Sequence, residues 1–215
     1  VLIYLILLAS ASLVLGPFAL SFMTAFKSPQ QFASESSLAL PNPWTTENFA
    51  RLFGGDYGFV SPIVVTAQVV AVILVGQLLF SVMAAYAFAK LQFRGRDSLF
   101  WVYLATLMVP QVVIVIPLFV MMSQLGLRNT FWSLVLPFMF GSPYAVFLLR
   151  EHFRSIPDDL IDAARIDGAG DWRILWQIVA PLSRGIISTL AIITVVSHWN
   201  NFMWPLIITT GRDWQ

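Results

Sequence analysis

The stretch RSIPDDLIDAARIDGAGDWRILWQIVAPL, residues 154–182, decides how the whole chain is interpreted. It is the one long polar interval after residue 60, and the sequence on both of its sides is apolar for more than the thickness of a membrane. The interval and its first neighbours hold six of the chain's eleven acidic residues, namely Glu151, Asp158, Asp159, Asp162, Asp167 and Asp171. We therefore expect a polar loop held at a membrane surface.

The first half of the stretch predicts a short amphipathic helix. Ser155 followed three residues later by Asp158 matches a capping box, and Pro157 falls in the first turn, where its missing N–H costs little. Gly168 ends this helix, because glycine adopts the left-handed C-terminal conformation without a side-chain clash. The helical spacing gives one apolar face, made of Ile156, Leu160, Ala163 and Ala164.

The second half predicts another short helix, which begins at Asp171 as N-cap and ends at Pro181. Its apolar positions are Trp172, Leu175, Trp176 and Val179. Small amphipathic helices joined by glycine need a partner for their exposed face. A helix that lies on lipid is the alternative, but the loop's acidic excess argues against an anionic membrane surface.

The loop resembles the cytoplasmic EAA loop of ABC importer permeases, and the carbohydrate importers of the maltose type are the closest likeness. The residues that carry this resemblance are Asp162-Ala163-Ala164, Asp167-Gly168-Ala169, Ile178 and Pro181. Three further segments resemble other parts of the same permeases: PNPWTTENFARLF (41–53), FAKLQFRGRD (88–97) and HWNNFMWPL (198–206). Three positions depart from the family pattern: Asp162 replaces a usual Glu, Ala180 replaces the leucine before Pro181, and Asn201 replaces a common acidic residue.

The resemblance implies an all-α, polytopic helical bundle in which residues 1–215 form one permease domain. The partners that it implies are a second homologous permease, two ATP-binding cassette subunits, an extracytoplasmic solute-binding protein and membrane lipid, without nucleic acid. ATP would be bound by the partner subunits, so this chain would be neither an enzyme nor a cofactor carrier. The residues that it implies at the joint with the ATPase are Asp158, Asp159, Asp162, Ala163, Ala164, Asp167 and Gly168.

The implied function is ATP-driven import of a carbohydrate or polyol-like solute. The alternative is import of an amino acid or peptide, because permeases for those solutes have the same kind of loop. The implied location is the cytoplasmic (inner) membrane of a bacterium or archaeon. Composition agrees with a membrane protein, since 58% of the residues are hydrophobic, 11% are charged and the mean hydropathy is +0.79.

Five membrane spans are predicted, at residues 1–26, 61–89, 99–122, 131–149 and 183–210. The first begins abruptly, with no basic segment and no cleavage pattern, so we interpret it as the trimmed start of a permease and not as a signal peptide. The resemblance implies a sixth span beyond the fifth, which we expect to be missing from this sequence.

Basic residues predict the orientation. Alternate connections place eight on one side: Lys90, Arg94, Arg96, Arg150, Arg154, Arg165, Arg173 and Arg184. The other side receives four: Lys27, Arg51, Arg128 and Arg212. The positive-inside rule makes the first side cytoplasmic, which places the loop inside the cell and Gln215 outside.

Polar side chains follow one face of the fifth span, where Thr194, Ser197, His198 and Asn201 fall at helical spacing. Polar groups that face lipid are costly, so this stripe should face other helices or a water-filled path. We predict that Gln77, Gln111, Thr194, Ser197, His198 and Asn201 line the solute path. Hydrogen bonding between helices is the alternative for each of them.

Several functions are disfavoured by the sequence. It contains no G-x-x-x-x-G-K-[ST] motif for nucleotide phosphates, and two histidines without any cysteine leave no credible metal cluster. A proton-coupled carrier would be expected to keep an intramembrane carboxylate, yet residues 60–96 and 98–150 contain none. An intramembrane enzyme lacks a nucleophile–base pair, because the neighbours Ser197 and His198 point apart on a helix.

Overall fold

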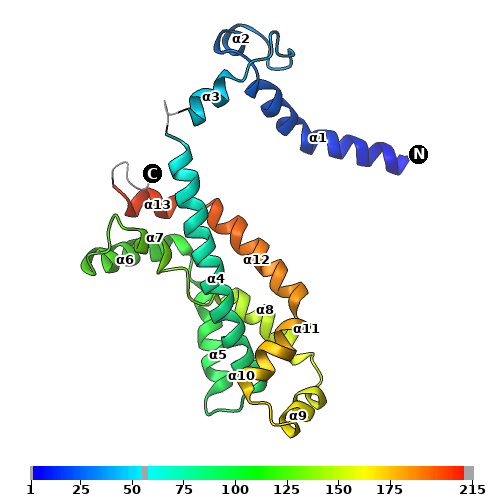
Figure 1. Ribbon diagram of the computed structural model, residues 1–215, viewed down its shortest axis with the longest axis vertical. Helices are drawn as coiled ribbons and strands as arrows, with labels where there is room; N and C mark the ends of the chain where they lie inside the picture. Colours follow the sequence, from blue (N-terminus) through cyan, green and yellow to red (C-terminus); the bar gives the residue numbers. More distant parts are fainter. Residues whose placement is uncertain (1, 55–57, 211–215) are drawn as a thin grey trace. The chain divides into compact units, whose positions relative to one another are not determined.

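The computed structural model describes residues 2–54 and 58–210, and the chain divides into two compact units, residues 1–63 and 64–215. Every regular element in the described residues is a helix, which confirms the predicted all-α fold (Figure 1). That residues 1–215 form a single membrane domain stays a prediction. Arg212 and Gln215, on which part of the orientation argument depends, lie outside the described residues.

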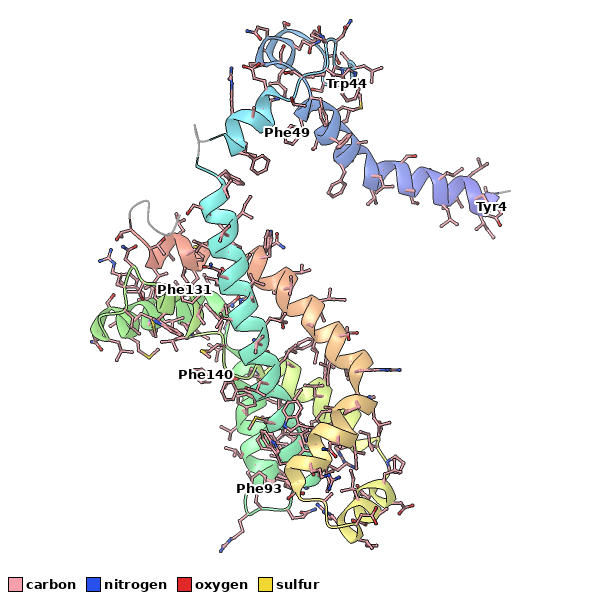
Figure 2. All side chains as sticks on the ribbon, viewed as in Figure 1. Tyr4, Trp44, Phe49, Phe93, Phe131 and Phe140 are labelled. Carbon is pink, nitrogen blue, oxygen red and sulfur yellow. The ribbon has the colours of Figure 1, made fainter. Side chains whose placement is uncertain are left out.

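The first unit contains α1 (Leu2–Ala25), α2 (Pro29–Ser34) and α3 (Glu47–Phe53). No residue of α1 is buried, and apolar side chains such as Tyr4 project from it all around (Figure 2). The chain after α1 is ordered by Lys27, which is 1% exposed and donates to the carbonyl of Ser36 at 2.9 Å. Asn48 of α3 donates to the carbonyls of Ala25 and Lys27 at 2.9 and 2.8 Å. These bonds hold the segment between α1 and α3 against the C-terminal end of α1.

The second unit is arranged around α4 (Val60–Lys90), which crosses its whole length in Figure 1. The helices that follow are α5 (Arg96–Ala105), the 3₁₀ turn η1 (Thr106–Met108), α6 (Gln111–Gln124), α7 (Phe131–Val135) and α8 (Pro143–Arg154). The loop and the last segment form α9 (Asp158–Ile166), α10 (Asp171–Ile174), the π-helix η2 (Leu175–Val179), α11 (Ala180–Leu182), α12 (Arg184–Trp199) and α13 (Met203–Ile208).

By length and composition, α1 and α4 can each cross a membrane. Two bent pairs, residues 96–108 with 111–124 and residues 171–182 with 184–199, would raise the number to four if each pair is one span. The spans predicted at 1–26 and 61–89 therefore correspond to single helices, and the other three do not.

The predicted third span is divided in the structure into α5 with η1 and α6, which meet at a bend of 100°. Pro110 explains the break: it has no N–H to donate, and it restricts Val109 before it to an extended backbone (φ −80°, ψ 115°). The predicted fourth span is also divided. It consists of α7 and α8 separated by turns, and Pro143 starts α8 at a position that tolerates proline.

The predicted fifth span is likewise divided, into α12 and α13. A continuous helix would need the N–H of residue 205 to reach the carbonyl of Asn201, and Pro205 has none to donate. The side chain of Asn201 instead accepts a long hydrogen bond from the N–H of Trp204 at 3.4 Å. Asn201 therefore helps to start α13.

Two apolar clusters hold the second unit together. The larger one joins α4, α5, α8, α9, α10 and α12 and contains fully buried residues such as Leu149, Phe153 and Ile174. The smaller one gathers Met122, Leu134, Trp204 and Ile208 beside α7 and α13. In Figure 1, α9 and α13 lie near opposite ends of this unit.

Arg150 of α8 ties three helices together inside the larger cluster. Only 9% of this residue is exposed, and its guanidinium carbon lies 3.9 Å from the ring centroid of Phe100 on α5. Its Nε donates to the carbonyl of Phe88 on α4 at 3.3 Å, and its Nη1 pairs with Glu151 at 2.7 Å. A buried cation that stacks on an aromatic ring and has hydrogen-bond partners is held in one geometry, so Arg150 favours a rigid contact among α4, α5 and α8.

Close contact at Gly76 leads to a stability prediction. A Cβ at this position of α4 would lie 2.6 Å from the carbonyl oxygen of Met139, a backbone atom. Gly76→Ala should therefore destabilise the protein by about 1–3 kcal/mol through overpacking and lower its melting temperature by several degrees. Gly185→Ala on α12 is the matched control, because no heavy atom lies within 4 Å of the added Cβ. Equal melting temperatures of the two detergent-purified variants would contradict the packing at Gly76.

Candidate coupling loop and solute cavity

The loop after α8 forms the predicted pair of short helices, and glycine ends the first of them. Gly168 has a φ of +79°, in the left-handed region. The N–H of Gly168 donates to the carbonyl of Arg165 at 3.0 Å, and the N–H of Ala169 donates to that of Ala164 at 2.9 Å. This pair of bonds defines a Schellman motif, so the predicted glycine stop is confirmed.

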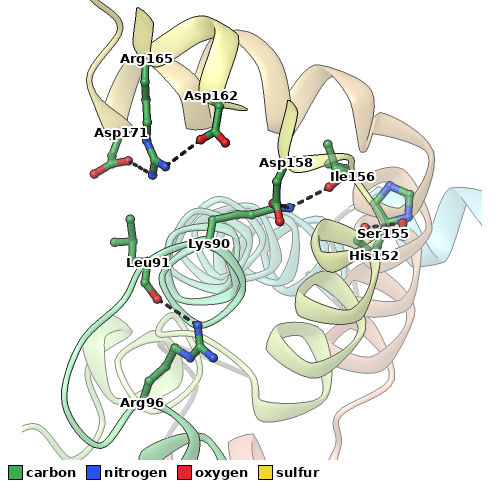
Figure 3. Close-up of polar contacts among 10 residues, drawn as sticks. All are labelled: Lys90, Leu91, Arg96, His152, Ser155, Ile156, Asp158, Asp162, Arg165 and Asp171. Atoms are coloured by element: carbon green, nitrogen blue, oxygen red, sulfur yellow. Dashed lines mark hydrogen bonds and ion pairs between the residues drawn. The ribbon is translucent and has the colours of Figure 1, made fainter. Parts of the chain in front are cut away.

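The predicted helix starts are wrong. Ser155 does not cap α9, because it caps the end of α8 and its hydroxyl donates to the carbonyl of His152 at 2.6 Å (Figure 3). Pro157 takes the N-cap position of α9 without a side-chain bond. Asp171 is the first residue of α10 and not its cap, because Gly170 precedes it there. Its carboxylate is occupied by other partners, Tyr86 and Arg165.

The buried face of the loop agrees in part with the predicted one: Ile156 and Ala164 are buried as predicted, whereas Leu160 and Ala163 are not. Ile161 and Ala164, three residues apart, pack into the larger cluster and are 2% and 9% exposed. Leu160 is 47% exposed, and Ala163 is exposed as well. Residues 160 and 161 are both apolar, so the spacing alone did not distinguish between them.

The residues predicted at the ATPase joint lie mostly on the outer surface of the loop. Six of them are exposed: Asp158, Asp159, Asp162, Ala163, Asp167 and Gly168. Ala164 is buried and belongs to the inner face. The exposed apolar residues Leu160 and Ile166 accompany the acidic ones, and Ile166 is 87% exposed. α9 thus presents a mixed apolar and acidic surface outward while its other face is fixed in the core.

Lys90, at the end of α4, holds the start of α9. Its ammonium donates to the carbonyl of Ile156 at 2.7 Å and pairs with the carboxylate of Asp158 at 2.6 Å (Figure 3). The hydrogen bond from Lys90, and then its charge, keep the pKa of Asp158 below its usual value. The stabilisation from this pair is thus complete above the unfolded pKa of the carboxyl, and it is lost as pH falls through the lowered folded pKa.

A cavity of about 770 Å³ lies in the second unit beside α4, α12 and the segment before α8. All six residues predicted for the solute path line it: Gln77, Gln111, Thr194, Ser197, His198 and Asn201. Polar residues that the prediction missed also contribute, including Ser142, Tyr144 and Asn200. No hydropathy pattern identified these three, because they lie at helix ends next to the breaks in the predicted spans: Ser142 is the N-cap of α8, Tyr144 is in its first turn and Asn200 is the C-cap of α12.

The two interpretations of the polar stripe apply to different residues. Thr194 joins helices, since its hydroxyl donates to the side-chain oxygen of Gln77 on α4 at 3.0 Å. Asn201 contributes to the start of α13, as described above. Ser197 is exposed to the cavity and makes no side-chain hydrogen bond in the part of the chain that the structure describes. Ser197 is thus the stripe residue that is most available to a solute.

Comparison with known proteins identifies the class. The family described as binding-protein-dependent transport system inner membrane component matches residues 77–214, so the chain belongs to this family. The chain is 36% identical over 206 residues to the diacetylchitobiose uptake system permease protein NgcG of Streptomyces coelicolor, which covers 94% of this chain and 66% of NgcG. It is 33% identical over 215 residues to the sn-glycerol-3-phosphate transport system permease protein UgpE of Yersinia pestis, covering 98% and 76% of the two chains.

A third relative is the arabinooligosaccharides transport system permease protein AraQ of Halalkalibacterium halodurans, at 37% identity over 80% of this chain and 62% of AraQ. The chain thus spans about two thirds of the length of NgcG and of AraQ, and about three quarters of UgpE. Among solved structures, a bacterial ABC transporter involved in the import of the acidic polysaccharide alginate superposes with a TM-score of 0.89. That match has 26% identity and covers 99% of this chain and 75% of the other.

Proposed function

We propose that this chain is the permease subunit of an ATP-driven importer and moves a neutral carbohydrate or polyol-like solute through the cavity beside α4 and α12. The observation that carries the proposal is the combination of family membership with a cavity lined by hydrogen-bonding side chains. Relatives named for diacetylchitobiose and arabinooligosaccharides support a saccharide as the solute. UgpE and the alginate importer are named for anionic solutes, so the neutral assignment rests on the cavity lining alone.

The lining of the cavity supports a neutral solute over an anionic one. Among the described residues that line it, none is Lys, Arg, Asp or Glu, whereas amides, hydroxyls and one imidazole are present. Amides and hydroxyls pair with sugar hydroxyls, while a phosphate or carboxylate favours a cation or charge-assisted donors. A panel of radiolabelled neutral oligosaccharides and anionic counterparts tests this. If the reconstituted complex takes up only the anionic members of the panel, the proposal of a neutral solute is refuted.

The loop supports ATP-driven coupling. α9 carries its exposed acidic and apolar residues on one surface and is anchored on the other, as a docking helix for a partner requires. We infer that a separate ATPase subunit binds this surface on the cytoplasmic side, that a second permease completes the path and that an external binding protein delivers the solute.

The proposed orientation leads to a labelling prediction. Ser155 and Ser36 are both exposed, and the chain contains no native cysteine that would compete for label. In inside-out vesicles a membrane-impermeant maleimide should react with Ser155→Cys and not with Ser36→Cys, and in intact spheroplasts the pattern should reverse. Reaction of both cysteines from one side would contradict the topology.

A further inference from the structure

Two side chains at the inner end of α4, one helical turn apart, contact the loop. Lys90 reaches the carbonyl of Ile156 and the carboxylate of Asp158, at 2.7 and 2.6 Å. Tyr86 donates its hydroxyl to the carboxylate of Asp171 at 3.1 Å. Residues four apart lie on the same face of a helix, so one face of α4 supplies both contacts.

These contacts lie at the two ends of α9. Ile156 and Asp158 are where α9 begins, and Asp171 starts the helix after it. Arg165, in the last turn of α9, connects the second contact to the helix, because its guanidinium pairs with Asp171 at 3.3 Å and Asp162 at 3.4 Å (Figure 3). α9 is therefore tied to α4 at its start directly and at its end through Arg165 and Asp171.

Burial makes the α4 side of these contacts rigid. The side chain of Lys90 is 5% exposed and Tyr86 is 3% exposed, so neither has room to change rotamer freely. Exposed ion pairs on flexible side chains contribute little, whereas a charge-assisted bond from a packed side chain fixes geometry. Beyond Pro62 in its first turn, α4 contains no proline as far as Lys90.

The same helix reaches the cavity. Gln77 lies 13 residues before Lys90, or roughly 20 Å along a helix, and accepts the hydroxyl of Thr194 at the cavity wall. We propose that Tyr86 and Lys90 are positioning residues that fix α9 to α4, so that displacement of α9 by its partner moves α4 and with it the cavity wall. This inference rests on the proposed function, because it concerns how hydrolysis is coupled to solute movement.

Lys90→Met tests the first contact, since it keeps the length of the side chain and removes the charge and the donors. In the full reconstituted complex we expect normal assembly and preserved basal ATP hydrolysis, with at least a fivefold lower ratio of neutral saccharide imported to ATP hydrolysed. Tyr86→Phe removes one hydroxyl while Arg165 still holds Asp171, so its ratio should fall by about twofold, and the double variant should fall further than either. Lys90→Arg should recover at least half of the ratio.

Arg94→Met is the matched control, because it removes an exposed cation four residues after Lys90 that has no contact with α9 among the described residues. A second readout is independent of transport. A nitroxide label on Ile166→Cys, the exposed last residue of α9, is measured on the detergent-purified full chain before the ATPase is added, because the ATPase would cover this surface. The label should become more mobile with Lys90→Met and Tyr86→Phe and stay unchanged with Arg94→Met.

The outcomes separate the two proposals. An assembled Lys90→Met complex with an unchanged import ratio and unchanged label mobility would overturn the positioning role. Loss of assembly with a normal ratio in the assembled fraction would also overturn it, because Lys90 would then serve folding alone. Failure of the unmodified complex to import with ATP would refute the proposed function instead, and the label mobility would still decide whether α4 holds α9.

Discussion

Gly168→Val is expected to reduce import at least tenfold, while Gly170→Val leaves it near the level of the unmodified protein. Gly168 has a φ of +79°, which a β-branched residue adopts only at a cost of roughly 1–2 kcal/mol. Gly170 lies two residues away with a φ of −76° and a ψ of 164°, a conformation that valine favours. A Cβ meets no heavy atom within 4 Å at either site, so the two variants differ in backbone strain and not in crowding.

The strain acts on the Schellman motif that ends α9. About 1–2 kcal/mol shifts the ratio of ordered to disordered loop by a factor of roughly 5–30, which is enough to weaken the docking of a partner. Import and ATP hydrolysis by reconstituted complexes, together with the amount of ATPase that co-purifies, measure the effect. Equal import by both variants would show that the conformation at Gly168 does not matter for coupling.

Ser197→Leu should lower import at least fivefold without changing the melting temperature. Ser197 faces the cavity and makes no side-chain bond in the described part of the chain, so its loss removes no internal contact. A hydroxyl-rich solute would lose one partner, at roughly 1–3 kcal/mol per bond, and would meet a bulkier wall. Val196→Leu, a neighbouring exposed position that does not line the cavity, is the control.

Two results are informative for Ser197. Reduced import with an unchanged melting temperature supports a role in the solute path. Unchanged import would contradict that role, and a lowered melting temperature in the same variant would mean that the polar stripe serves helix packing throughout. Thr194 already has such a packing role, since it bonds to Gln77.

The sequence was sufficient for the helical class, the glycine stop of α9 and the group of polar residues at the cavity. These depend on local rules: apolar length, the freedom of glycine at positive φ, and helical spacing over a few turns. Hydropathy was insufficient at Pro110, because apolar residues continue across the point where the backbone breaks. A proline in such a run predicts a bend, but the 100° angle at Pro110 is set by packing.

The contacts between α4 and the loop were beyond prediction from the sequence alone. Lys90 lies 66 residues before Ile156, and Tyr86 lies 85 residues before Asp171. In the sequence, Lys90 is one basic residue among the eight on its side of the membrane, and no pattern distinguishes Tyr86 from the apolar residues around it. The position of Lys90 at the end of an apolar run predicts a membrane boundary. Its contacts with Ile156 and Asp158 depend on the fold and cannot be read from the sequence.

We propose that ATP hydrolysis by a separate subunit bound to the exposed surface of α9 drives import through this chain. The direct test uses proteoliposomes that contain the complete complex, with ATP confined to one side and the solute-loaded binding protein on the other. ATP on the side of Ser155 with binding protein on the side of Ser36 should stimulate hydrolysis and accumulate saccharide. The reversed arrangement should do neither. Accumulation without ATP, driven by an ion gradient alone, would contradict the account.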